Sequence, residues 1–157
     1  MYTSADVFRK HWKIFLGVSL FTGMFAAIYE HFSHQVYSWP MMLAFLVPLV
    51  LGVTPTAILS TRKMLRRKPY EGKLRAGVNL YYAGVATLTV GMVATGVVEI
   101  YGTTNRLLAT YWYVAGVLLV AGIAVTIAAL VERRREIEEK KAARRAAKKA
   151  ERRKKPE

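Results

Sequence analysis

Four long runs without a charged residue dominate this chain, at residues 14–29, 35–61, 76–98 and 107–131. An α-helix needs roughly 20 consecutive apolar residues to cross a bilayer, and three of the four runs are longer than that. The first run is shorter and is completed by Glu30 and the histidines that follow it. We therefore predict an all-α membrane protein with four transmembrane helices, which places most of the 157 residues in lipid.

The breaks between the runs give the expected helix boundaries. We expect helices at residues 8–33, 39–61, 77–101 and 107–131. Together they form a transmembrane domain over residues 1–131, followed by a basic cytoplasmic tail, 132–157, whose composition favours a helix. The N-terminal run resembles a signal peptide, but no A-x-A-like cleavage site follows, so we interpret it as a retained helix. Pro48 and Pro55 remove backbone donors from the second helix, which should be kinked.

Lys and Arg are distributed very unevenly among the segments that flank the runs. The N-terminal segment has three, the loop over residues 62–75 has seven and the tail has thirteen. The loop between the first and second helices has none, and the loop between the third and fourth has only Arg106. Because cytoplasmic segments carry the excess of Lys and Arg, we expect a multi-pass plasma-membrane protein with both termini in the cytoplasm.

The two halves of the chain resemble each other. Residues 17–26 are similar to residues 84–94, and a glutamate follows each stretch, Glu30 in the first half and Glu99 in the second. This similarity suggests a duplicated two-helix hairpin whose copies are related by an axis along the membrane normal. The alternative is chance, because membrane helices are built from a small set of residue types.

Small residues recur every four positions in the first and third helices. These candidate packing residues are Ser19, Gly23 and Ala27 in the first helix and Thr87, Gly91 and Thr95 in the third. Small side chains at this spacing let two helix backbones approach closely in a membrane. We infer that the first and third helices contact each other through these residues; the alternative is that they face a partner protein.

Four side chains could form a ligand site at the outer ends of the first and third helices. Glu30 lies seven residues after Gly23, on the same helix face. His34 follows Glu30 by four residues and shares that face if the helix continues, and His31 lies next to Glu30. Glu99 lies four residues after Thr95 on the third helix. If the helices pack as inferred, carboxylates and an imidazole meet and could bind a divalent cation, a proton or a polar ligand. The identity of a metal stays open, and the alternative is that these side chains simply reach the lipid headgroups.

Several kinds of chemistry have no support in the sequence. The chain has no cysteine, which excludes disulfides, thiol chemistry and cysteine-ligated metals. A haem held by two histidines is disfavoured, because His11 lies at the opposite face of the membrane from His31 and His34. The chain has no phosphate-binding loop, metalloprotease motif or nucleophile constellation, so we expect neither an enzyme nor a bound cofactor.

The expected partners of the basic segments are lipids. Basic residues close to an anionic leaflet contribute about 1 kcal/mol each, so the 62–75 loop and the tail should face anionic headgroups. Membrane topology already explains the charge, and the tail has no aromatic side chains to stack on bases, so we do not expect nucleic acid as a partner.

One region resembles a known group of proteins. Residues 29–38, Tyr-Glu-His-Phe-Ser-His-Gln-Val-Tyr-Ser, followed by Met42, Phe45 and Pro48-Leu49, look like small four-helix integral membrane proteins of Gram-positive bacteria. No activity is assigned to that group, so the resemblance implies a bacterial plasma-membrane protein and no catalytic residues.

These observations favour a non-enzymatic membrane protein, an accessory subunit or small scaffold of a membrane complex. The alternative is a protein that binds or transports an ion, a metal or a small ligand through Glu30, His34 and Glu99. Because four helices are few for a transporter, that alternative requires a homo-oligomer.

Overall fold

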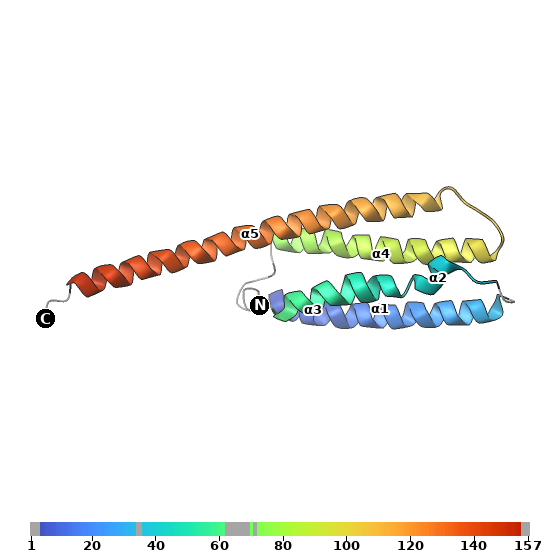
Figure 1. The fold of residues 1–157 in the computed structure, drawn as a ribbon, viewed down its shortest axis with the longest axis horizontal. Coiled ribbons are helices and arrows are strands. Elements are labelled where there is room, and N and C mark those ends of the chain that lie inside the picture. The colour runs from blue at the N-terminus through green and yellow to red at the C-terminus, as the bar shows by residue number, and fades with distance from the viewer. Residues whose placement is uncertain (1–3, 34–35, 62–69, 71, 155–157) are drawn as a thin grey trace.

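The structure is a computed structural model that describes residues 4–33, 36–61, 70 and 72–154. This part of the chain is helical, with the element order α1, α2, η1, α3, α4 and α5 (Figure 1). Their bounds are Ser4–Phe32, Trp39–Leu43, Val47–Val53, Thr54–Thr61, Gly72–Ile100 and Leu108–Lys154. Four stretches are long and apolar enough to cross a membrane, namely α1, Trp39–Thr61, α4 and the Leu108–Ala146 part of α5.

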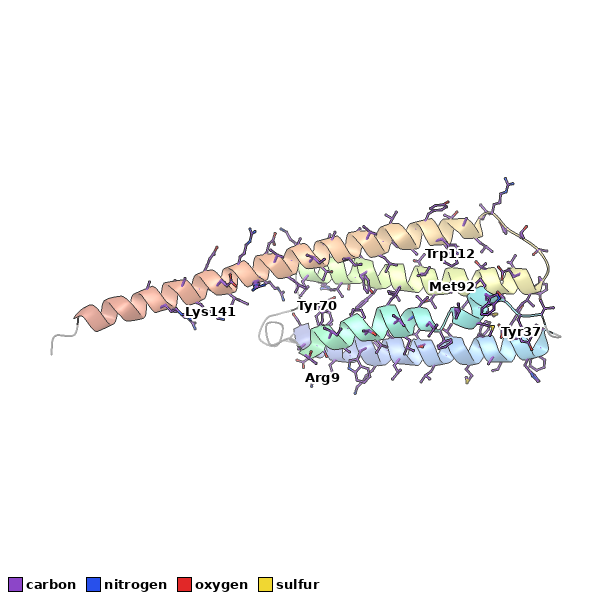
Figure 2. All side chains as sticks on the ribbon, viewed as in Figure 1. Arg9, Tyr37, Tyr70, Met92, Trp112 and Lys141 are labelled. Atoms are coloured by element: carbon purple, nitrogen blue, oxygen red, sulfur yellow. The ribbon has the colours of Figure 1, made fainter. Side chains whose placement is uncertain are left out.

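The four long stretches lie beside one another in a row. α4 packs against α5 on one side and against α2 and η1 on the other, while α1 packs against η1 and α3 (Figure 1). We call the end where α1 and α4 begin the tail end, and the end where they finish the loop end. Figure 2 places Arg9 and Tyr70 at the tail end, Tyr37 at the loop end, and Lys141 on the part of α5 that extends past the other helices.

The first and third helices do not meet through the small-residue stripes as inferred, because Gly23 and Gly91, the central residues of the two stripes, each face the other helix of their own hairpin. Ser19 donates a hydrogen bond of 2.8 Å from Oγ to the carbonyl oxygen of Phe45, and Gly23 faces the Phe45 side chain. Gly91 faces Tyr111 of α5 instead of α1. Of the other stripe residues, Ala27 is exposed, Thr87 lines a surface pocket with α5 residues, and Thr95 donates to the carbonyl of Gly91 on its own helix.

The expected kink of the second span is a break into three pieces. A short helix, α2, is followed by turn residues, by the π-helical segment η1, which contains Pro48, and by α3, which contains Pro55. Pro55 has no N–H to donate to the carbonyl of Leu51 four residues earlier. The hydroxyl of Tyr81 on α4 donates to that carbonyl instead, at 2.7 Å. Neighbouring helices therefore supply hydrogen bonds to the broken backbone, as an apolar environment requires.

The contact between α4 and α5 is built on small residues seven positions apart. α4 contributes Gly77, Gly84 and Gly91, and α5 contributes Ala115, Gly122 and Ala129. A Cβ atom on Gly84 would come within 2.9 Å of the backbone nitrogen of Leu119, and one on Gly122 would collide with the backbone of Tyr81. Glycine thus sets the close approach of the two backbones, and a seven-residue repeat keeps the seam on one side of each helix.

A small apolar core joins the two hairpins at the tail end. Phe8 of α1 is buried against Leu74 and Val78 of α4 and Ala129 of α5. The ring of Phe8 also meets the ring of Tyr70 edge-on, with 5.7 Å between centroids. This cluster fixes the start of α1 against the second hairpin.

The expected tail is continuous with the fourth span. The transmembrane stretch expected at residues 107–131 and the expected helical tail form one helix, since α5 runs unbroken from Leu108 to Lys154. Most of the basic loop over residues 62–75 lies outside the described residues.

Candidate ligand site at the loop end

Glu99 joins the two hairpins at the loop end. The carboxylate lies in the last turn of α4, and its Oε2 accepts a 2.5 Å hydrogen bond from the Ser38 hydroxyl. Ser38 is the N-cap residue of α2, yet its hydroxyl makes no cap bond to its own helix. One turn before Glu99, Gly96 allows the side chain of Met41 to pack directly on the α4 backbone. α2 is therefore docked on the end of α4 by one charged hydrogen bond and one close apolar contact.

Glu30 is held on the inward face of α1. The buried residues Ser19, Thr22 and Ala26 mark this face, and Glu30 follows Ala26 by one helical turn. Its Oε1 atom is buried and has no hydrogen-bond partner among the residues that the structure describes. A buried carboxylate oxygen without a donor costs free energy, so Glu30 is the most conspicuous unsatisfied group at this end.

The two histidines have different positions relative to the expected cluster. His31 is exposed and its ring lies edge-on to Phe32, with 5.4 Å between centroids. His34 lies outside the described residues, so the structure leaves the expected Glu30–His34–Glu99 grouping untested. Within the described ranges, no three His, Asp or Glu side chains lie close enough together to hold a metal ion.

A cavity of about 390 Å³ opens at the loop end between α1 and the end of α4. It is lined by Phe25, Ile28, Tyr29, Phe32, Ser33, Ile100 and Tyr101. We call it the mouth cavity. Three hydroxyl-bearing side chains line it, and neither glutamate does. The sequence alone does not predict this cavity, because aromatic residues at helix ends are equally expected at any membrane interface.

No family model, curated protein or solved structure matches this chain. The class of the protein therefore rests on its fold alone: its described residues form a helical protein with four helices long and apolar enough to span a membrane.

Proposed function

We propose that this chain is a four-span plasma-membrane protein that serves as a non-enzymatic accessory subunit or small scaffold of a membrane complex. The observation that carries the proposal is how little of each span the fold itself covers. In the most apolar stretch of each span, the fold buries 17% of residues in α1 and in α5, 28% in the second span and 33% in α4. Helices arranged in a row leave both broad faces to lipid or to the helices of a partner.

The exposed face of α5 is the surface most suited to a partner helix. Large apolar side chains recur on it at alternating intervals of four and three residues, with one interval of seven: Tyr113, Val117, Val120, Ile127 and Val131. Val117 and Val120 are each 69% exposed. This spacing is the one through which two helices interlock along a seam.

The topology part of the proposal places both termini in the cytoplasm, on the strength of the Lys and Arg distribution. Because the chain has no cysteine, a single introduced cysteine reports its own location. We expect Asn105→Cys to react with a membrane-impermeant maleimide in intact cells, and Lys141→Cys to react only after permeabilisation. The reverse pattern would overturn the orientation, and labelling of both in intact cells would overturn the four-span arrangement.

The partner part of the proposal is tested on α5. A photoreactive amino acid at Val117 or Val120 should give a crosslink to a distinct polypeptide in the native membrane, and the buried position Ala115 serves as the control. Native mass spectrometry of the gently extracted protein should then show the same polypeptide at a fixed stoichiometry. If the protein carries only lipid and forms neither adduct nor complex, the accessory-subunit proposal fails.

The Oε1 of Glu30, which has no hydrogen-bond partner among the described residues, favours a second candidate function, the binding of a cation or a hydrogen-bond donor at the loop end. Titration calorimetry with Zn²⁺, Mn²⁺ or Ca²⁺ alone provides the test on the detergent-solubilised chain. Binding that Glu30→Gln abolishes and His31→Ala leaves intact would support this candidate. Binding that both variants retain, or none in the native chain, would rule out a cation at Glu30.

A further inference from the structure

A second cavity, of about 480 Å³, lies between α1 and α4 where neither helix packs on the other. The ring contacts between these helices lie nearer the tail end, where His11 stacks on Tyr82 and Phe15 meets Tyr82 edge-on. Beyond Tyr82 the two helices flank the second span, and Pro48 of η1 lines the space between them. We call this space the groove. Its walls come from Phe15, Val18, Phe21, Thr22 and Phe25 of α1 and from Val85, Ala86, Thr89, Val90, Val93 and Ala94 of α4.

The groove offers no free hydrogen-bonding group to an occupant. Among the described residues that line it, the two polar side chains, Thr22 and Thr89, donate to the carbonyls of Val18 and Val85 on their own helices, each at 2.8 Å. An apolar cavity of this kind does not retain water. Phe21 is 66% exposed and Val90 is 54% exposed, so the groove opens sideways, toward the lipid of a surrounding bilayer. Its occupant has to be apolar and has to enter from the membrane.

The dimensions of the groove suit an extended chain. From Phe15 to Phe25 the α1 wall is about 15 Å long, because a helix rises about 1.5 Å per residue. The volume of about 480 Å³ is therefore spread along an elongated space that is open on one side. An extended hydrocarbon chain can lie along this space.

The mouth cavity follows the groove along α1, and Phe25 lines both. An occupant that follows this path passes from an apolar wall to the hydroxyls of Tyr29 and Tyr101, while the Ser33 hydroxyl donates to the carbonyls of Glu30 and Val36. The carboxylates of Glu30 and Glu99 lie at the same end of the molecule. Hydroxyl donors suit a phosphate, and carboxylates suit an ammonium group and repel an anionic headgroup.

We propose that the groove and the mouth cavity together bind one zwitterionic phospholipid, with an acyl chain between α1 and α4 and the ammonium-bearing headgroup at the loop end. The bound chain fills a gap that side chains leave, so it acts as a structural element between the hairpins. The proposal rests on insertion into a membrane, which the cysteine-labelling experiment checks separately. Correct labelling without lipid retention would refute the groove proposal alone.

Lipid retention by groove-filling variants gives the test. The purified full chain is stripped with detergent, incubated with dioleoyl phosphatidylethanolamine and examined by native mass spectrometry. We expect one retained lipid in the native chain and at least fivefold less in Ala86→Phe and in Ala94→Phe. Ala27→Phe adds the same bulk to an exposed site on α1 outside the groove, so it should retain lipid as the native chain does. Equal retention in all four proteins, or none in the native chain, would overturn the proposal.

The chain and headgroup assignments have their own readouts. A phospholipid with a photoreactive acyl chain should crosslink to peptides that contain residues 15–25 or 85–94. This experiment uses the native protein, so it does not depend on the folding of a variant. Phosphatidylglycerol, which is anionic, should be retained less than phosphatidylethanolamine, and Glu30→Gln should reduce that difference because it removes a carboxylate near the ammonium group. Crosslinks spread evenly over all helices would show that the acyl chain does not bind in the groove. A preference for phosphatidylglycerol would refute the zwitterionic headgroup.

Discussion

Buried hydroxyl groups have two contrasting fates in this fold. Thr56 is fully used, since its Oγ1 donates to the carbonyl of Gly52 at 2.5 Å and lies 3.3 Å from the Tyr82 hydroxyl. The Oγ1 of Thr126 is buried without a hydrogen-bond partner in the described part of the chain, pressed against Gly77. The same residue type therefore stabilises the fold at one position and only fills space at the other.

Replacing Thr126 by valine should leave stability unchanged or raise it by up to about 1 kcal/mol, because the variant keeps the shape and removes an unsatisfied group. Thr56→Val, the matched control, should cost about 1 kcal/mol because it removes a donor that is in use. Unfolding by sodium dodecyl sulfate in mixed micelles, followed by circular dichroism, measures both. A larger loss for Thr126→Val than for Thr56→Val would contradict the assignment.

Tyr70 gives the fold a pH dependence at its tail end. Burial raises the pKa of the Tyr70 phenol to about 12, and nearby Arg75 partly opposes the rise. The folded state thus favours the neutral phenol. Its contribution to stability is complete below the ordinary pKa of about 10 and is lost as the pH rises through about 12.

A difference titration tests this prediction for Tyr70. The tyrosinate absorbance of the native chain minus that of Tyr70→Phe should show one group titrating near pH 12. A difference curve centred near the ordinary value would show that the phenol is not buried.

At the scale of elements, the second span depends on its neighbours for backbone hydrogen bonds. Ser19 of α1 and Tyr81 of α4 donate to carbonyls on either side of Pro48, at Phe45 and Leu51. The prolines at 48 and 55 predicted a kink from the sequence alone. The π-helical segment and the identity of the donors could not be predicted, because they depend on which helices lie alongside.

Tyr81→Phe should destabilise the protein by about 1 kcal/mol, the usual scale of a side-chain hydrogen bond within a membrane protein. In a Pro55→Ala background the loss should be smaller, since residue 55 then has an N–H that can reach the Leu51 carbonyl. The four proteins form a double-mutant cycle that the same micelle unfolding measures. A cost that is identical in both backgrounds would show that the hydroxyl does not compensate for the proline.

The seam between α4 and α5 offers a second test at this scale. Gly84→Ala should cost about 1–3 kcal/mol, because its Cβ would meet the α5 backbone at Leu119 and push the helices apart. Gly116→Ala lies on the same hairpin with open space around it, and should be neutral or stabilising by up to about 1 kcal/mol. Equal effects of the two substitutions would argue against close packing at Gly84.

At the scale of the molecule, the number of long apolar helices was predictable, but their pairing was not. Uncharged runs separated by charged breaks report helices directly. Pairing depends on which of several small-residue stripes is used, and the glycines seven residues apart on α4 determine it more than the four-residue stripe does. Glu30 and Glu99 were recognisable as rare acidic residues near helix ends. The Ser38 bond to Glu99 and the two cavities required the fold.

The bond between Ser38 and Glu99 should couple the two hairpins. Ser38→Ala and Glu99→Gln should each weaken the fold, and the double variant should lose less than the sum of the two. We expect a coupling energy of about 0.6 kcal/mol and at most about 1.7 kcal/mol, the mean and the maximum for side-chain hydrogen bonds between membrane helices. Strictly additive losses in the unfolding experiment would show that the contact contributes nothing to joining the hairpins.

The unbroken course of α5 has a geometric consequence. From Glu132 to Ala150 the helix advances about 27 Å, because each residue adds about 1.5 Å. In the proposed four-span arrangement, an upright α5 would place its last turns more than three screening lengths, of about 8 Å each at physiological salt, from the headgroups. The tail would then act as a spacer of fixed length, so a molecule bound at its end would be held at a fixed distance from the other helices. A rotation of α5 about its axis would turn that end by the same angle.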